Sequence, residues 1–509
     1  MARQRRNRAK KSGERNALNI LPWRKISNPY PPIQPLSDDQ IEAIHQTSLR
    51  VLDELGMKVL DGETRSLLRD AGARVDETSE MVFMDPAMVE ERIATTPNRF
   101  TIHARNPKKS LEIGGNVINF GPVGGPAFVS DLDRGRRAGT YVELCDFVKL
   151  LQMFDIIQIG GAGSFAPLDL PADSRHLDQA FAGLTLTDKV MGSNLLGGER
   201  ARDGLALIKI AHGITDSDLE QKVYTSGGIN TNSPRQVDGN MAQGLLTLTR
   251  ANQPVIVTPF TLCGAMAPAT VAGALAQQNA EALFGLALIQ IVQPGAPAVY
   301  GGFTSNVDMK SGAPAFGTPE YTLATQATGQ LCRRYKVPYR SSSTNASNAP
   351  DAQAAYESMM SIWAAVMGYA NIVYHGAGWL EGGLVGSFEK LVIDAEMLQM
   401  MAVYLEGIRV DEDTLAFDAI KEVQPGGHYF GAQHTIARYE DAFYAPLVSD
   451  WRNFETWSDA GAKDTAQRAN AIWKRMLTEY EKPAIETDVE EHMRDYITRR
   501  KEQIHGRAV

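Results

Sequence analysis

The segment Asn371-Ile-Val-Tyr-His-Gly-Ala-Gly-Trp379 places a short apolar run directly before glycines, a histidine and a tryptophan. The same order of a short apolar run, small residues and a helical stretch occurs eight times along the chain. The apolar runs are Val117–Phe120, Ile156–Ile159, Lys189–Gly192, Lys222–Thr225, Val255–Thr258, Ala298–Gly301, Pro338–Ser341 and Asn371–Tyr374. Successive runs begin 33 to 43 residues apart, which is the spacing of repeated strand–helix units.

Eight strand–helix units predict an α/β fold of the TIM-like (β/α)8 barrel type, in which parallel strands close into a ring. A solenoid has a similar period, but no fixed side-chain signature recurs in these units. The predicted domains are a basic, proline-rich arm (residues 1–36), a small N-terminal α/β cap (37–115), the barrel (116–405), and an aromatic-rich loop with a helical C-terminal extension (406–509).

The composition is that of a globular protein. Of 509 residues, 43% are hydrophobic and 22% are charged. The longest apolar run, Ala282–Val292, is too short to span a bilayer and predicts a buried helix, so no membrane association is expected. Cys145, Cys263 and Cys332 are too far apart for a disulfide framework or a zinc knuckle, which favours a reducing cytoplasm. The first 15 residues are strongly basic and the remainder is acidic, which argues against a general nucleic-acid binder.

Glycines follow the ends of most of the predicted strands, at the face where barrel enzymes carry their active sites. Glycine there permits tight turns, and it also lets the backbone approach a large flat ligand closely. The glycines chosen as candidates for contact with such a cofactor are Gly124, Gly161, Gly228, Gly302 and Gly376.

The common catalytic motifs are absent from the sequence. It contains no Walker loop, no HExxH, no GxSxG and no strand followed by GxGxxG, and no cluster of ligands predicts a bound metal. His375 and Trp379 therefore become the centre of the predicted site, although each could instead be a packing residue. Glu381 is a second catalytic candidate, but it shares with Glu389, Asp394 and Glu396 an alternative role in caps and ion pairs.

Several longer segments resemble the trimethylamine methyltransferase superfamily over roughly residues 40–480. The matching segments are Gly121–Gly125, Pro350–Glu357, Tyr374–Gly383, Ser387–Asp394, Gly426–Tyr429 and His434–Thr435. The resemblance implies a TIM-like barrel that moves a methyl group from a methylated amine to a corrinoid (cobalamin) carried by a partner protein. Archaeal trimethylamine members carry pyrrolysine in the region that corresponds to Ser341–Ala349, whereas this chain has only standard residues. It therefore resembles the non-pyrrolysine branch, whose characterised members, such as glycine betaine:corrinoid methyltransferase, use quaternary amines.

This chemistry assigns roles to the candidate residues. A quaternary ammonium has no N–H group, so aromatic faces are its natural partners, and Trp379, Tyr374, Phe303 and Tyr300 lie near predicted strand ends. A betaine carboxylate would need donors such as Asn345 or His375; Arg340 ranks lower because it lies inside a strand. A lyase or decarboxylase using His375 as a base and a non-catalytic methylamine-binding subunit remain alternatives, and a homo-oligomer is expected.

Overall fold

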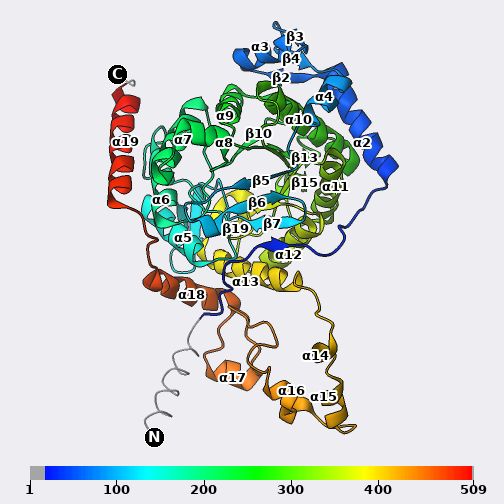
Figure 1. Ribbon diagram of the computed structural model, residues 1–509, viewed down its shortest axis with the longest axis vertical. Helices are drawn as coiled ribbons and strands as arrows, with labels where there is room; N and C mark the ends of the chain where they lie inside the picture. The colour runs from blue at the N-terminus through cyan, green and yellow to red at the C-terminus, as the bar shows by residue number, and fades with distance from the viewer. Residues whose placement is uncertain (1–17, 507–509) are drawn as a thin grey trace.

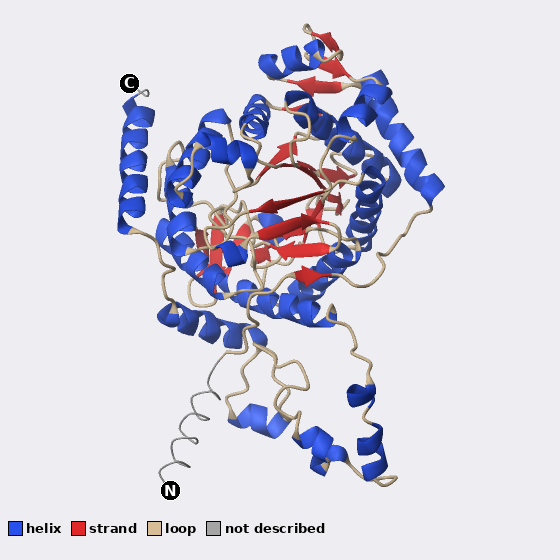
Figure 2. Ribbon diagram, viewed as in Figure 1, coloured by secondary structure: helices blue, strands red, loops and turns tan. Residues whose placement is uncertain are grey.

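A parallel sheet surrounded by helices forms the centre of the protein, a computed structural model that describes residues 18–506 (Figures 1 and 2). The strand order is β1-β7-β18-β17-β14-β12-β10. The strands are β1 (Ile26–Ser27), β7 (Val117–Phe120), β10 (Gly227–Thr231), β12 (Val255–Pro259), β14 (Ala298–Gly301), β17 (Tyr339–Ser342) and β18 (Ile372–Tyr374). All pair in parallel except β1, which runs antiparallel to β7.

The helices that follow these strands enclose them in a ring. They are α5 (Tyr141–Met153), α6 (Arg175–Leu186), α7 (Gly198–His212), α8 (Asp216–Gln221), α9 (Gly239–Arg250), α10 (Val271–Val292), α11 (Pro319–Tyr335), α12 (Ala352–Met367) and α13 (Phe388–Tyr404). Most of them have an N-cap residue whose side chain accepts a hydrogen bond from a free backbone N–H group in the first turn. Asp351 has this role at α12. Helix α10 is apolar on all sides and almost wholly buried, which confirms the predicted core helix.

Five of the predicted strands are confirmed within one residue, and three differ. The segments Ile156–Ile159 and Lys189–Gly192 form only a single bridge, between Ile159 and Val190. In place of the predicted strand at Lys222–Thr225 the chain forms β10, which begins at Gly227, two residues after the predicted end. The amide oxygen of Gln253 accepts hydrogen bonds from the backbone N–H groups of Tyr224 (2.8 Å) and Thr225 (3.3 Å), so a side chain takes the place of the strand ladder there.

The amino ends of the parallel strands are covered by a hairpin of β5 (Arg99–Ile102) and β6 (Leu111–Gly114). Its apolar side chains share one buried cluster with side chains from the strands and their neighbouring segments. The cluster consists of Ile102, Ala104, Leu111, Ile113, Ile159, Val190, Val223, Ile256, Val299 and Ile372. Because this hairpin floor fills the amino end, ligands must enter at the carboxyl ends of the strands, which we call the mouth.

The N-terminal cap stands at one side of the ring (Figure 1). It contains α2 (Asp38–Arg50), a π-helical turn (Val51–Leu55), β2 (Met57–Val59), α3 (Gly62–Asp70), β3 (Arg74–Asp76), β4 (Met81–Phe83) and α4 (Pro86–Ile93). Ser37 and Gln40 form the predicted capping box at α2. The short strand β11 (Gln236–Val237) adds to the cap sheet beside β2. The basic cluster of the predicted N-terminal arm lies outside the described residues, and residues 18–36 lie along the body.

Two small sheets extend the loops at the mouth. One has the order β13-β15-β16, from β13 (Thr261–Cys263), β15 (Thr304–Val307) and β16 (Pro314–Ala315). The other has the order β19-β20-β8-β9, from β8 (Phe128–Asp131), β9 (Gly135–Ala138), β19 (Trp379–Leu380) and β20 (Val385–Ser387). These sheets order long insertions that would otherwise be free loops.

After α13, residues 406–457 leave the body and return to it; we call them the projecting segment (Figure 1). It contains α14 (Glu412–Leu415), α15 (Phe417–Glu422), α16 (Gln433–Ile436) and most of α17 (Phe454–Asp459). The chain then forms α18 (Thr465–Glu479), which packs on α13, and α19 (Thr487–Gly506), which packs on α7. No helix among residues 18–506 is long and apolar enough to cross a membrane.

Lys189 is buried at the end of the strands opposite to the mouth. Its Nζ donates hydrogen bonds to the carbonyl oxygens of Leu151 (2.6 Å), Phe154 (2.8 Å) and Ile157 (2.6 Å) and so ties the end of α5 to the next unit. We expect Lys189→Met to lower the free energy of unfolding by about 3 kcal/mol, because three buried carbonyl groups lose their partner. The exposed Lys222→Met serves as control and should change stability by less than about 0.5 kcal/mol in urea unfolding. Equal urea midpoints for both variants would contradict this role.

Candidate active site

His375 stands at the mouth directly after β18, at the point predicted from the sequence. Its backbone has φ +57°, a conformation that costs energy in a non-glycine residue and is often found at functional sites. The backbone N–H donates to the carbonyl of Pro122 (3.1 Å), and Nδ1 lies 3.1 Å from Oγ of Ser342. The ring centroid lies 4.2 Å from that of Trp379. The two residues that anchored the sequence prediction are therefore in contact, and neighbouring strand ends fix the imidazole.

The imidazole of His375 is neutral at physiological pH. Burial lowers its pKa well below 6.5, and the positive charge of Arg340 lowers the pKa further. A neutral ring carries no charge that would repel a cationic ligand.

Aromatic side chains gather on one side of His375. Phe303 lies with its ring centroid 5.9 Å from His375, 6.5 Å from Trp379 and 5.0 Å from Phe260. Phe316 lies 6.2 Å from Trp379 and 5.7 Å from Phe303. Phe303 and Trp379 were predicted, whereas Phe260 and Phe316 were not, although Phe260 directly follows β12. Tyr374 lies beside this group, 6.4 Å from His375. Such faces can bind a quaternary ammonium.

Reciprocal hydrogen bonds hold Trp379 in place. Its indole Nε1 donates to the carbonyl of Asn345 (3.1 Å), and the Asn345 side chain donates to the carbonyl of Trp379 (2.6 Å). A side chain at Gly383 would meet the indole ring at 2.5 Å, so the turn after Trp379 requires glycine. Asn345, a predicted substrate contact, is fully buried and positions the tryptophan.

A buried polar network supports the loop that carries Trp379. The amide of Asn345 also donates to Oγ of Ser358 (3.1 Å), to which Nζ of Lys390 donates as well (2.9 Å). Lys390 forms an ion pair with Asp394, and Asp394 accepts a hydrogen bond from the backbone N–H group of Gly378 (2.8 Å). Asp394 is thus in an ion pair, which is the alternative role that the sequence analysis gave it. The network fixes both sides of Trp379.

Arg340 extends its side chain from β17 to a position between the rings of Tyr374 and Phe303. The guanidinium carbon lies 5.3 Å from the ring centroid of Tyr374 and 5.5 Å from that of Phe303. Only 6% of the residue is exposed, yet its buried Nε and Nη1 have no hydrogen-bond partner among the described residues. Burial lowers its pKa, and only tyrosine hydroxyls oppose that effect. A buried guanidinium without a carboxylate is costly, so Arg340 is a candidate to pair with an anion.

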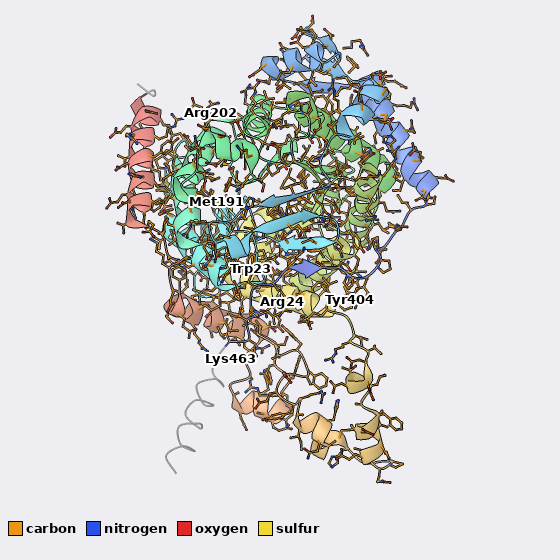
Figure 3. The ribbon with its side chains drawn as sticks, viewed as in Figure 1. Trp23, Arg24, Met191, Arg202, Tyr404 and Lys463 are labelled. Atoms are coloured by element: carbon orange, nitrogen blue, oxygen red, sulfur yellow. The ribbon has the colours of Figure 1, made fainter. Side chains whose placement is uncertain are left out.

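A cavity of about 250 Å³ opens beside His375 at the loops after the first three predicted strands. Its wall includes Tyr374, His375, Gly124, Gly161 and Met191; Met191 lies inside the ring of helices (Figure 3). His375 therefore belongs to the wall of the cavity and also lies next to the aromatic group.

The five candidate glycines fall into two groups. Gly124 and Gly228 have space beyond their Cα atoms, with no neighbouring atom closer than 3.7 Å to an added Cβ. The other three have no such space. A Cβ added at Gly161 would lie 2.1 Å from Leu151, one at Gly302 would lie 2.8 Å from Thr328, and one at Gly376 would lie 2.9 Å from Gly121. Close packing alone accounts for these three glycines, and only Gly124 and Gly228 offer open backbone.

Two predicted residues lie apart from the group. Tyr300 is fully buried, and its hydroxyl contacts the side chains of Gln278 (3.3 Å) and Asn279 (3.2 Å) on α10, outside the strands. Glu381 forms an ion pair with Arg136 (2.8 Å) at the rim. Within residues 18–506, no three His, Cys, Asp or Glu side chains are grouped closely enough to bind a metal ion.

The whole chain is similar to known proteins. The family model described as trimethylamine methyltransferase (MTTB) matches residues 1–505. A glycine betaine methyltransferase of Desulfitobacterium hafniense (strain Y51) is 35% identical over 470 residues, covering 92% of this chain and 97% of that protein. The trimethylamine methyltransferase MttB of Desulfitobacterium hafniense (strain DSM 10664 / DCB-2) is 30% identical, covering 85% and 87%. The solved Methanosarcina barkeri monomethylamine methyltransferase (MtmB) is 10% identical, with a TM-score of 0.46 over 87% of this chain and 93% of that one.

Proposed function

Since the chain belongs to the trimethylamine methyltransferase (MTTB) family, we propose that it transfers a methyl group from a betaine to the corrinoid of a partner protein. A betaine is a quaternary methylated amine that also carries a carboxylate. The observation that carries this substrate class is the unpaired guanidinium of Arg340 beside an aromatic group.

The two halves of a betaine match the two features of the mouth. The aromatic faces of Trp379 and Phe303 suit the ammonium, with about 0.5–2 kcal/mol for each contact. The carboxylate would supply the charge that Arg340 lacks and could accept a bidentate pair of hydrogen bonds from it. Trimethylamine has no carboxylate and would leave Arg340 unpaired beside a second cation, so a betaine is favoured.

The reaction needs little acid–base help from the protein. The C–N bond breaks, its electron pair stays on nitrogen, and the amine leaves as a neutral tertiary amine. The reduced corrinoid supplies the Co(I) nucleophile that accepts the methyl group. The residues of this chain bind, orient and dehydrate the ammonium, and correct placement of reacting groups can contribute about 7–11 kcal/mol. Neutral His375 holds its neighbours in place without adding charge. The open backbone at Gly124 and Gly228 fits the approach of a flat macrocycle.

We also infer that the strands form the closed (β/α)8 ring expected from the sequence. Single backbone hydrogen bonds support this closure where regular strands are missing. Gln158 N–H donates to the carbonyl of Phe120 (2.9 Å), Gly160 N–H to Val190 (2.7 Å) and Ser193 N–H to Ser226 (2.8 Å). These bonds lead from β7 to the segment that precedes β10.

The proposed activity is tested with the purified chain, reduced cobalamin or corrinoid protein, and glycine betaine. The expected products are methylated corrinoid, followed by its absorbance, and one equivalent of dimethylglycine. Omission of the corrinoid should abolish product formation. Formation of dimethylglycine without corrinoid, or no turnover with glycine betaine, carnitine and proline betaine, would overturn the proposal.

The neutral state of His375 predicts the pH dependence of substrate binding. Protonation would place a positive charge beside the ammonium and raise KM as pH falls through the pKa. Because that pKa lies well below 6.5, we expect the KM for betaine to stay constant from pH 8 to about pH 6. His375→Gln cannot titrate and is the matched control. A KM that rises between pH 8 and pH 6.5 in the parent enzyme, but not in the variant, would contradict a neutral imidazole.

A further inference from the structure

The projecting segment exposes large apolar side chains. Ile408, Phe417, Phe430, Phe443, Trp451 and Phe454 are each at least 70% exposed. The helices of the segment have only four to six residues, so they gain little stability of their own. An apolar segment of this kind needs a surface that covers it.

Both ends of the segment are held to the body. It begins two residues after Tyr404, the last residue of α13, which is labelled in Figure 3. At its return, the buried carboxylate of Glu396 accepts hydrogen bonds from the backbone N–H groups of Val448 and Ser449 (2.9 Å). The side chain of Asn19 donates to the carbonyl of Pro446 (2.9 Å). The apolar tip therefore extends away from the ring, as Figure 1 shows.

The body carries a second exposed apolar surface close to the root of the segment. On α12, Tyr356, Met360 and Trp363 follow one another at helical spacing and are 60%, 42% and 36% exposed. On α13, Met400 and Tyr404 are 44% and 41% exposed, and the rings of Trp363 and Tyr404 lie 5.2 Å apart. These five residues form one surface, which we call the α12–α13 stripe.

We propose that the projecting segment of one copy of this chain packs on the α12–α13 stripe of a second copy, in a reciprocal dimer. A twofold arrangement covers both surfaces of both copies at once, since each chain offers one segment and one stripe. The five most exposed aromatic rings of the segment can bury roughly 500–900 Å² per copy, close to the ~800 Å² per partner of a stable complex.

A second copy fits these surfaces better than the corrinoid protein does. The corrinoid protein must dock at the mouth and leave after each turnover, and transient interfaces are less apolar than permanent ones. The segment projects from the side of the ring beyond α13, away from the ring of strands that frames the mouth (Figure 1). Permanently exposed rings in a free enzyme would promote aggregation, whereas a dimer formed on folding hides them.

The test is the mass of the full chain in solution, by light scattering during size-exclusion chromatography. We expect at least twice the chain mass of 55.6 kDa. Phe430→Ser/Phe443→Ser in the segment and Met360→Ser/Trp363→Ser in the stripe should each reduce the mass to that of a monomer. Val142→Ser/Met309→Ser removes exposed apolar groups elsewhere, 67% and 75% exposed, and should leave the oligomer intact.

Mixing the two monomeric variants separates a lost interface from misfolding. The stripe variant keeps its segment and the segment variant keeps its stripe, so the mixture should form a heterodimer through one of the two contacts. A monomeric parent chain, an oligomer that survives both pairs of substitutions, or a mixture that stays monomeric would overturn the proposal. An increase in mass that requires the corrinoid protein would also overturn it.

Discussion

Replacing Arg340 by methionine is expected to lower kcat/KM for glycine betaine by roughly 10²- to 10³-fold. The loss corresponds to about 3–4 kcal/mol, close to the cost of leaving a charged group without its partner in a buried site. Here the unpaired group would be the carboxylate of the substrate. Demethylation of trimethylamine, if the enzyme performs it at all, should change little or improve, because that amine offers no anion to the guanidinium.

Stability distinguishes a substrate-binding role for Arg340 from a structural role. In the ligand-free enzyme its guanidinium is buried without a hydrogen-bond partner on Nε and Nη1, so Arg340→Met should keep or raise the Tm. Arg340→Lys retains the charge without the planar fork and should give an intermediate kcat/KM. A lower Tm in Arg340→Met with unchanged kcat/KM for betaine would assign the residue to the fold alone.

The second large effect is expected at Asp394. Asp394→Asn leaves the buried ammonium of Lys390 without its counter-ion and should lower the free energy of unfolding by about 3–5 kcal/mol. The variant should also lower kcat for betaine, because the loop of Trp379 depends on the same network. Asp394 accepts a hydrogen bond from Gly378, and Lys390 and Asn345 both donate to Ser358. Urea unfolding and single-turnover methyl transfer measure the two effects.

A double substitution separates the charge from the shape of this network. Lys390→Met/Asp394→Leu replaces the buried pair by apolar groups of similar size and should recover most of the lost stability. Activity should recover less than stability, because the hydrogen bond to the backbone N–H group of Gly378 is still missing. If the double variant is as unstable as Asp394→Asn, packing at these positions and not the unpaired charge sets the cost.

Much of the fold follows from local patterns. The apolar runs that became β7, β12, β14, β17 and β18 are strongly β-forming and recur at a regular spacing, so they could be predicted. The runs at Ile156–Ile159 and Lys189–Gly192 look the same in sequence, but single hydrogen bonds replace the ladder there. Local propensity cannot reveal such a loss, because it depends on how neighbouring segments meet in space.

The direction in which each side chain points was harder to predict from the sequence than the positions of the strands. Tyr300 and Arg340 both lie within strands, and the alternation of a strand sends neighbours to opposite faces. Val299 packs in the same cluster as the hairpin floor, so Tyr300 faces α10, whereas Arg340 faces Phe303 and Tyr374. The sequence prediction ranked Arg340 lower because it lies inside a strand, and the role proposed for Arg340 reverses that rank. Phe316 lies in an insertion whose path only the three-dimensional structure reveals.

The hairpin floor of β5 and β6 has a kinetic consequence under the proposed function. A reaction chamber with its amino end filled has one entrance, and the methyl acceptor must cover that entrance to reach the methyl group. The amine must then enter first and the demethylated amine must leave last, a compulsory order of binding and release. Excess demethylated corrinoid protein should therefore slow turnover by trapping empty enzyme, and more betaine should relieve that inhibition.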